Sequence, residues 1–347
     1  MIRTLVVGLG QMGRSHALAY DTNPGFEIIG LVNRSPVDLP DDLRRYPMLD
    51  SFEAGLAQKP DLVCIASYTD THADLACAAM EAGAHVFVEK PLAPTVAEAE
   101  RVVATARRTG RKLVIGYILR HHPSWIEFIA RARELGPPFV MRMNLNQQSS
   151  GSAWAIHKRL MDSTSPVVDC GVHYLDVMLQ ITDAPPVQVR GMGVRLSDEI
   201  APAQVNYGHL QVLFADGSVG WYEAGWGPMI SETAFFVKDV MGPRGAVSIV
   251  MDEGAASADV DTHTKTSCIR LHAAALGPDG TFAKPDEMLS MADEPGHQAL
   301  CDREQAFVRD AIENDRDLNR HMDDAVRSLA VVLAADRSMR EGRAVDL

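Results

Sequence analysis

Asp169 and His173 have the types and the spacing needed for acid–base chemistry. They are four positions apart, so a helix would place them on one face, with Asp176 one turn further along. A carboxylate next to an imidazole raises the imidazole pKa and fixes the orientation of the ring, as a general base requires. The alternative is a helix in which the two side chains only satisfy each other. No Cys or Glu completes a known ligand spacing, so no metal is expected here.

Lys90 is a further candidate, because it stands where a buried strand is expected to end. It follows the apolar run Ala84–Val88 and Glu89, and Pro91 fixes the turn after it. In an open parallel sheet, ligands bind beyond the carboxyl ends of the strands. A lysine that is partly desolvated there loses proton affinity and can do acid–base work. The alternative is an ordinary surface lysine in a strand-to-loop turn.

A glycine-rich turn near the start of the chain predicts a dinucleotide site. The apolar run Ile2–Val7 passes without a spacer into a G-x-G-x-x-G motif. A strand, this motif and a helix together form the dinucleotide-binding fingerprint. Its glycines allow a tight turn, a close approach to a pyrophosphate and close packing of helix on strand. A strand–turn–helix without a ligand is the alternative. The residues expected to contact the cofactor here are Gly8, Gly10, Gln11, Met12 and Gly13.

The end of the second strand bears on the choice between NAD and NADP. An NAD enzyme usually carries Asp or Glu about 20 residues beyond the glycine motif. This chain has Asn33 there, followed by Arg34 and Ser35. Asn binds a hydroxyl without repelling a 2′-phosphate, and Arg34 can pair with one. Arg34 could equally stack on the adenine. We therefore expect NADP or NAD, with NADP favoured.

Polar residues also follow the apolar run Asp61–Ala66. Ser67, Thr69 and His72 are expected at the carboxyl end of that strand, where they could bind a ribose or a phosphate. The competing interpretation is that Asp70 or Thr71 simply caps the next helix.

The elements that position these residues alternate between strand and helix up to about residue 120, which indicates βαβ units and a mostly parallel sheet. Strands are predicted at Ile2–Val7, Phe26–Val32, Asp61–Ala66, Ala84–Val88 and Lys112–Ile115, with helices at Ser15–Tyr20, His72–Ala82 and Thr95–Thr109.

Beyond about residue 120, several strands follow one another without helices between them, which suggests an antiparallel sheet. Strands are predicted at Phe139–Gln147, Val187–Val194, Val205–Phe214, Ser218–Ala224, Glu232–Val240 and Ala246–Met251. Helices are predicted at Pro123–Leu135, Val167–Ile181, Gly296–Glu313 and Asp323–Arg340, and a surface loop at Ala275–Pro295. The predicted fold class is α/β plus α+β, with a Rossmann domain over residues 1–120 and a substrate-binding and oligomerisation domain over residues 121–347.

Composition narrows the class of protein. The 347 residues carry a formal net charge of −13, which argues against non-specific nucleic-acid binding. The five cysteines are scattered, and Cys64 and Cys77 fall on apolar segments as core thiols, a usage typical of a reducing cytoplasm. No apolar run is long enough for a membrane helix, and no signal peptide is expected. We therefore expect a cytoplasmic protein that binds neither membranes nor nucleic acids.

Three motifs together resemble the Gfo/Idh/MocA oxidoreductases, the family of glucose–fructose oxidoreductase and inositol dehydrogenase. They are the glycine motif, the block from Ala82 to Leu92 that contains Glu-Lys-Pro, and the Asp169-x-Gly-x-His173-x-x-Asp176 segment. The resemblance covers nearly the whole chain. It implies a Rossmann domain, then a domain on an open, mostly antiparallel sheet through which members pair into dimers or tetramers.

The resemblance also implies roles for single residues. Lys90, Asp169 and His173 would form the catalytic set and contact the substrate. His72, Glu89 and Lys90 would contact the cofactor, with Arg120 as a looser match, and the Lys90–Pro91 bond would be cis. Many members have a Gly-Gly run before the catalytic Asp; here residues 163–168 are Ser-Thr-Ser-Pro-Val-Val, which leaves the loop shape and the substrate in doubt.

The expected function is hydride transfer between a nicotinamide and a secondary alcohol of a sugar, sugar acid or cyclitol. Trp154, His157 and Lys158, placed in the loop before the Asp–His helix, are candidates for substrate binding, and Lys158 would suit a carboxylate. Tyr174, Trp221 and Trp226 are weaker candidates, for which ordinary packing is favoured. One alternative is a sensor of the same fold without turnover. Another is a reductase of a non-sugar imine or enoyl-type substrate.

Overall fold

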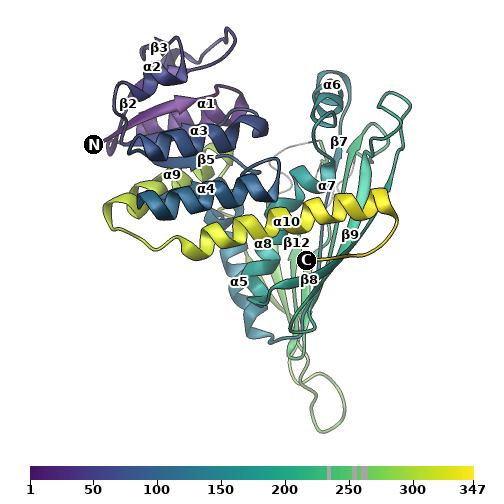
Figure 1. The fold of residues 1–347 in the computed structure, drawn as a ribbon. Helices are drawn as coiled ribbons and strands as arrows, with labels where there is room; N and C mark the ends of the chain where they lie inside the picture. Colours follow the sequence, from purple (N-terminus) through teal and green to yellow (C-terminus); the bar gives the residue numbers. More distant parts are fainter. Residues whose placement is uncertain (233–235, 252–255, 259–264) are drawn as a thin grey trace. The chain divides into compact units, whose positions relative to one another are not determined.

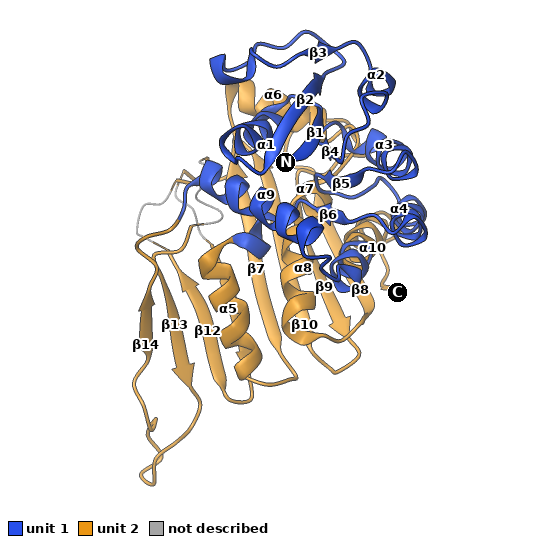
Figure 2. Cartoon of the chain, turned by 90° about the vertical axis from the view of Figure 1, so that its left-hand side faces the viewer, with its two compact units in different colours: residues 1–121, 295–326 blue, residues 122–294, 327–347 orange. Residues whose placement is uncertain are grey.

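The computed structural model describes residues 1–232, 236–251, 256–258 and 265–347, and the chain divides into two compact units (Figures 1 and 2). Unit 1 comprises Met1–His121 and Pro295–Val326, and unit 2 comprises His122–Glu294 and Arg327–Leu347. None of the described helices is long and apolar enough to cross a membrane.

Unit 1 is built on a six-stranded parallel sheet in the order β3-β2-β1-β4-β5-β6. Its strands are β1 (Ile2–Val7), β2 (Phe26–Val32), β3 (Met48–Leu49), β4 (Leu62–Ile65), β5 (His85–Val88) and β6 (Leu113–Ile115). The central strands are apolar at almost every position because helices cover both faces of the sheet. The prediction of a parallel doubly wound sheet is confirmed.

Helices α1 (Gln11–Thr22) and α9 (His297–Glu313) lie on one side of this sheet, and α3 (Thr69–Glu81) and α4 (Val96–Thr109) lie on the other (Figure 2). Shorter elements are α2 (Phe52–Leu56), η1 (Asp41–Leu43) and η2 (Ile118–His121). Tyr20 of α1, Val308 of α9 and Phe87 of β5 share one buried apolar cluster. Local signals set the limits of α4: the Thr95 side chain accepts from Glu98 N–H, and Gly110 ends the helix with φ of +64°.

Residues 295–326 return to unit 1 after the first segment of unit 2, residues 122–294. Tyr20 Oη donates to Gln305 Oε1 at 2.6 Å, and the Ile115 N–H donates to His321 Nε2 at 2.8 Å. The expected division at residues 120 and 121 therefore differs from the observed units in this segment. The periodicity of apolar residues indicates that a helix has an apolar face, but it does not indicate which sheet that face covers.

Unit 2 is built on a nine-stranded sheet in the order β14-β13-β12-β11-β7-β10-β9-β8-β15. Only β7 and β10 pair in parallel, so the sheet is mostly antiparallel, as predicted. Its strands are β7 (Val140–Gln148), β8 (Pro186–Val194), β9 (Tyr207–Phe214), β10 (Val219–Gly227), β11 (Lys238–Gly242), β12 (Gly245–Val250), β13 (Cys268–Ala273), β14 (Glu287–Ser290) and β15 (Val345–Asp346).

One face of this sheet packs against helices. These are α5 (Pro123–Glu134), α7 (Pro166–Asp169), α8 (Gly171–Thr182) and the second half of α10 (Asn319–Glu341), whereas α6 (Gly151–Leu160) has only Trp154 buried. Leu210 and Val212 of β9 are buried, whereas the alternating residues Gln211 and Leu213 are exposed on the other face. That open face has a hollow of about 650 Å³ lined by residues of β7, β8, β9 and β10, including Arg142, Arg190 and Trp221.

Four expectations for unit 2 were wrong in detail. The segment with Trp154 is the helix α6 rather than a loop, and the helix expected over Val167–Ile181 is divided at Cys170 into α7 and α8. Strand β13 was missed, and β14 lies within the expected surface loop Ala275–Pro295. Of the strand expected over Glu232–Val240, residues 233–235 lie outside the described residues, and β11 begins at Lys238.

Candidate active site

The glycine turn after β1 has the geometry that its sequence predicts. Gly8 has φ of +89°, and a Cβ on Gly13 would lie 1.9 Å from the Gly8 carbonyl oxygen. A Cβ on Gly10 would meet nothing within 4 Å. Gly13 is thus required for the packing of the turn, whereas Gly10 borders open space. Helix α1 begins here without a side-chain cap and without an acidic residue in its first turn. Its amino end therefore suits an anionic pyrophosphate, for which Gln11 and Met12 would supply N–H groups.

Asn33 stabilises the same turn. Its Oδ1 accepts from the Leu9 N–H at 2.9 Å, and its Nδ2 donates to the Ser35 carbonyl at 2.7 Å. Arg34 is exposed, and its guanidinium carbon lies 5.7 Å from the centre of the Tyr68 ring. The amide of Asn33 is therefore committed to the backbone, and Arg34 is the cation that this loop presents to a ligand.

The polar segment after β4 is held by hydrogen bonds within the protein. Ser67 Oγ lies 2.7 Å from Thr71 Oγ1, and the buried His72 ring lies 2.9 Å from the Pro91 carbonyl and 3.1 Å from the Ser67 carbonyl. Burial lowers the pKa of His72. His72 thus joins the loops after β4 and β5, and this geometry does not favour the direct cofactor contact expected for it. Tyr68, rather than Asp70 or Thr71, is the N-cap residue of α3 and makes no side-chain cap.

Lys90 stands directly beyond β5 and is partly exposed. The Lys90–Pro91 peptide bond is cis, as the resemblance implied. The Lys90 N–H donates to Glu89 Oε2 at 3.1 Å, and the buried Glu89 side chain also contacts His16. The loops after β1, β4 and β5 therefore bring Gly8, Ser67 and Lys90 to the carboxyl ends of adjacent parallel strands, where an open sheet binds its ligand.

Arg120 lies in η2, and Asp324 accepts a hydrogen bond from its guanidinium at 2.9 Å. The guanidinium carbon also lies 6.0 Å from the centre of the Tyr117 ring. Arg120 is only 16% exposed, so it is held within unit 1 by these partners. The expected cofactor contact of Arg120 remains a prediction.

Asp169 and His173 come from unit 2, where Asp169 ends α7 and His173 lies in the first turn of α8. Both are partly exposed, whereas Asp176 is fully buried and accepts from Gln180 Nε2 at 3.0 Å. Asp176 thus has a role in the core, unlike the other two. The helix divides at Cys170, and a Cβ on the next residue, Gly171, would approach Val332 and Tyr222 to 3.0 and 3.2 Å.

Among the aromatic and basic candidates on α6, His157 packs against Trp226 of unit 2. Its ring stacks on Trp226 with centres 4.5 Å apart, and its Nδ1 lies 2.9 Å from Ser149 Oγ. Burial lowers the pKa of His157, and the negative charge of Asp169 partly opposes this effect. The negative charge of Asp169 thus acts on His157, and both residues belong to unit 2.

The other candidates are occupied by contacts within unit 2. Trp154 is 5% exposed, so it packs rather than offering a ring face, and Lys158 pairs with Glu199 at 2.6 Å. Tyr174 is buried and stacks on Tyr222 at 4.9 Å. Trp226 is buried as well, in line with the packing role favoured for it.

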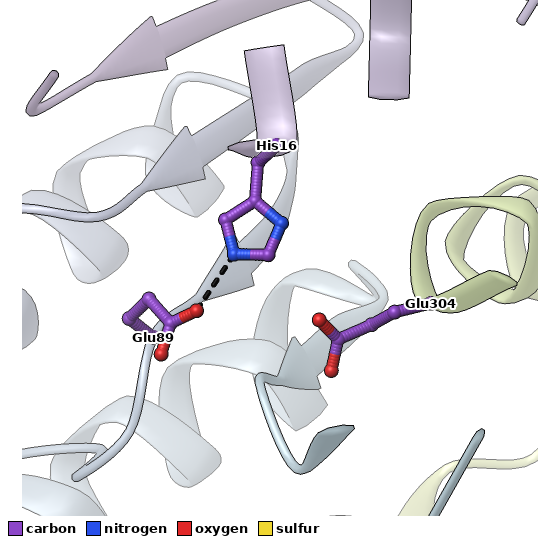
Figure 3. Close-up of side chains that lie close together, drawn as sticks. All are labelled: His16, Glu89 and Glu304. Carbon is purple, nitrogen blue, oxygen red and sulfur yellow. Dashed lines mark hydrogen bonds and ion pairs between the residues drawn. The ribbon is translucent and has the colours of Figure 1, made fainter. Parts of the chain in front are cut away.

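Figure 3 shows a buried polar group in which Glu89, an expected cofactor contact, lies close to His16 and Glu304, which the sequence did not single out. His16 Nε2 lies 2.6 Å from Glu89 Oε1, and Glu304 comes from α9. The signal was present, because Glu304 and Gln305 occupy positions of α9 that otherwise carry the buried residues Leu300, Cys301 and Val308. Polar residues within an apolar helical stripe indicate a buried polar contact.

Comparison with known proteins identifies both parts of the chain. Residues 2–117 match the model of the oxidoreductase family with an NAD-binding Rossmann fold, and residues 127–248 match the Gfo/Idh/MocA C-terminal domain. The chain is 23% identical in sequence to the aldose-aldose oxidoreductase from Caulobacter crescentus, solved in complex with glycerol. All of both chains is covered, and the TM-score is 0.78.

Two curated relatives are similar in sequence. UDP-N-acetylglucosamine 3-dehydrogenase of Acidithiobacillus ferrooxidans is 30% identical over 198 residues, which cover 56% of this chain and 58% of the relative. The scyllo-inositol 2-dehydrogenase (NAD(+)) of Bacillus subtilis is 26% identical over 267 residues, covering 72% and 73%. The chain thus spans little more than half of the first relative's length. Together with the two matched domains, these similarities show that the chain belongs to the Gfo/Idh/MocA oxidoreductase family.

Proposed function

We propose that the protein is an NAD(P)-dependent oxidoreductase that interconverts a secondary alcohol and a ketone on a sugar, sugar acid or cyclitol. The observation that carries the proposal is the turn at Gly8, Gly10 and Gly13, which leads into the uncapped amino end of α1. This arrangement favours a bound dinucleotide pyrophosphate. Lys90 follows a neighbouring strand of the same sheet.

Oxidation of the alcohol removes a proton from its oxygen and a hydride from its carbon. His173 accepts the proton, and Asp169 orients the imidazole. Lys90 donates a hydrogen bond to the same oxygen and stabilises its developing negative charge. A bound nicotinamide supplies the hydride acceptor, and the steps reverse for reduction. Lys90 belongs to unit 1, and His173 belongs to unit 2.

The substrate class rests on the two relatives, one named as a dehydrogenase of a nucleotide sugar and the other of a cyclitol. Unit 2 would supply substrate contacts from Asp169, His173 and His157. Lys158 is a weaker candidate for a carboxylate because Glu199 already pairs with it. Trp154 is buried, so its role is to pack α6 against the rest of unit 2.

For the cofactor we propose NADP over NAD. Asn33 carries no charge that would repel a 2′-phosphate, and its amide is committed to Leu9 and Ser35. Arg34 is exposed beside it and able to pair with a phosphate. The B. subtilis relative is named as an NAD(+) enzyme, so the loop at Asn33 and Arg34 is where a difference in preference would arise.

We also propose that the protein forms a homodimer or homotetramer through the open face of the unit 2 sheet. Leu213 and Val219 are exposed there beside the hollow that Arg142 and Trp221 line. Apolar side chains grouped on an open sheet face favour burial by another surface. Light scattering of the protein and of a Leu213→Glu variant would test this: a monomeric wild type would contradict it.

The deciding experiment is a panel of sugars, cyclitols and sugar acids, each offered with NAD and with NADP and followed at the nicotinamide absorbance. Turnover of one polyol would support the proposal and identify substrate and cofactor together. Cofactor binding without turnover across the panel would favour the sensor. A protein that binds neither cofactor would refute the proposal.

A further inference from the structure

A chain of buried polar residues lies behind Lys90 in unit 1, and the proposed reaction makes no use of it. It runs from Tyr20 and His16 on α1 to Glu89 at the end of β5, and to Glu304 and Gln305 on α9 (Figure 3). Apart from Glu89, which is 7% exposed, each of these residues is at most 1% exposed. Polar groups buried this deeply are costly unless each has a partner, so their arrangement calls for a physical reason.

The hydrogen bonds fix the direction of this chain. Tyr20 Oη donates to Gln305 Oε1 at 2.6 Å, which leaves the Gln305 amide nitrogen to donate to His16 Nδ1 at 3.0 Å. His16 therefore carries its hydrogen on Nε2 and donates it to Glu89 Oε1 at 2.6 Å. The other oxygen of Glu89 accepts from the Lys90 N–H at 3.1 Å. Both oxygens of this carboxylate are thus held from opposite sides.

The hydrogen atoms of the group His16, Glu89 and Glu304 are placed in a way that does not suit a metal ion. Donor atoms of His16, Glu89 and Glu304 lie within 4.8 Å of one another, a spacing that a cation would also suit. Both nitrogens of His16 are engaged, however, and the one near the carboxylates carries hydrogen rather than a free lone pair. A proton, rather than a metal, is the cation that this geometry accommodates.

Glu304 is the member that takes the proton. Its Oε1 is buried without a hydrogen-bond partner, and its side chain points towards Glu89 and His16 (Figure 3). Burial and the negative charge of Glu89 raise the pKa of Glu304 well above its usual range. Two carboxyl groups that share a site repel each other when both are ionised, so one of them stays neutral. Burial alone would raise the pKa of Glu89, but hydrogen bonds from His16 and Lys90 and the charge of Lys90 outweigh this effect and lower it, so Glu89 is the ionised one.

Tyr20, Cys64, His72 and Cys301, which also surround Glu89, are neutral at neutral pH. Burial raises the pKa values of Tyr20, Cys64 and Cys301 and lowers the pKa of His72. These groups come from α1, β4, α9 and α3, the elements packed around the end of β5. Among these groups the Glu89 carboxylate thus carries a negative charge, and this charge acts on Lys90.

We propose that His16, Gln305 and the neutral acid Glu304 are positioning residues that hold the Glu89 carboxylate fixed and ionised beside Lys90, and that this carboxylate keeps Lys90 an ammonium ion. The interaction is reciprocal: the attraction that favours ionised Glu89 equally favours protonated Lys90. An ammonium donates a hydrogen bond to the reacting oxygen, which an amine does far more weakly. This role rests on the proposed function, in which Lys90 contacts that oxygen.

The test titrates Lys90 directly and needs no substrate. The full-length protein is labelled with 13C at lysine Cε, and the Lys90 signal, identified by its loss in Lys90→Arg, is followed from pH 6 to pH 11. Glu89→Gln should lower the titration midpoint by about one pH unit or more, because it removes an adjacent opposite charge. Glu304→Gln resembles the neutral acid and should leave the midpoint within about 0.3 pH units of wild type. The matched control is Glu81→Gln on the surface of unit 1, which should change nothing.

An unchanged midpoint in Glu89→Gln would overturn the proposal. So would an equal lowering in Glu304→Gln, because Glu304 would then be ionised. If Glu89→Gln does not fold, 13Cδ-glutamate labelling of wild type decides instead: Glu304, identified by its loss in Glu304→Gln, should give a neutral carboxyl signal at pH 7, and an ionised signal refutes the proposal. A stoichiometric divalent metal in the purified protein would also refute it. None of these readouts uses turnover. Failure of this proposal can therefore be distinguished from failure of the proposed function in the substrate panel.

Discussion

Replacing Lys238 with methionine should stabilise the protein below neutral pH. Lys238 opens β11 in unit 2, is 1% exposed, and has its ammonium 4.5 Å from the Phe236 ring centre and 5.4 Å from that of Trp125. Burial lowers its pKa from 10.5 to about 7, and the nearby Glu294 only partly opposes this. Keeping this lysine charged in the folded state is therefore costly.

The magnitude follows from the difference between the two pKa values. The gap between 10.5 and about 7 corresponds to about 5 kcal/mol, because each pH unit is about 1.4 kcal/mol. Between these values the unfolded chain holds a proton that the folded protein has released, so stability rises with pH. Below pH 7 both states hold the proton and the full cost is present. Lys238→Met should thus be several kcal/mol more stable than wild type at pH 6, and the difference should shrink by about 1.4 kcal/mol per pH unit above 7.

Denaturant unfolding at pH 6, 7, 8 and 9 measures this difference. All four tryptophans lie within residues 122–294, so their fluorescence reports on unit 2. Lys284→Met is the matched control, because Lys284 is exposed and its replacement should have no pH-dependent effect. A difference that stays constant from pH 6 to pH 9, or a variant less stable than wild type at pH 6, would refute the reasoning.

Three further predictions concern the candidate site. His173→Ala should lower kcat by about 100-fold or more with cofactor affinity retained, because a general base is lost; near-normal turnover would contradict the assignment. Arg34→Ala should reduce kcat/KM with NADP at least about 10-fold more than with NAD, whereas equal losses would exclude phosphate pairing. Gly13→Ala should cost about 1–3 kcal/mol in thermal unfolding, because its Cβ would lie 1.9 Å from the Gly8 oxygen. Gly10→Ala should unfold like wild type and weaken only cofactor binding in a fluorescence titration; equal stability losses in both glycine variants would contradict these roles.

Much of unit 1 could be predicted because its signals are local. The apolar runs at β1, β2 and β4 are buried on both faces, and short helices between them leave a parallel sheet as the natural arrangement. The glycine turn was equally clear, since its two constrained positions carry the one residue type that fits.

The missed features depend on tertiary contacts. Helix α6 buries only Trp154, so it has no apolar stripe that periodicity could detect. Next to the division at Cys170, Gly171 packs closely against Val332, which lies far away in the sequence. The partners of His16 come from β5 and α9, and spacing along the chain carries no information about them.

The return of residues 295–326 to unit 1 has a consequence for how the protein is made. The ribosome releases the first 121 residues long before it synthesises α9, whose Val308 and Ala311 belong to the apolar cluster of that unit. Until then, Tyr20 and Phe26 lack part of their cover, and the nascent chain exposes an apolar surface to which chaperones can bind. A gene truncated after residue 121 should therefore yield an aggregation-prone fragment, and a separately supplied peptide of residues 295–326 should restore its solubility.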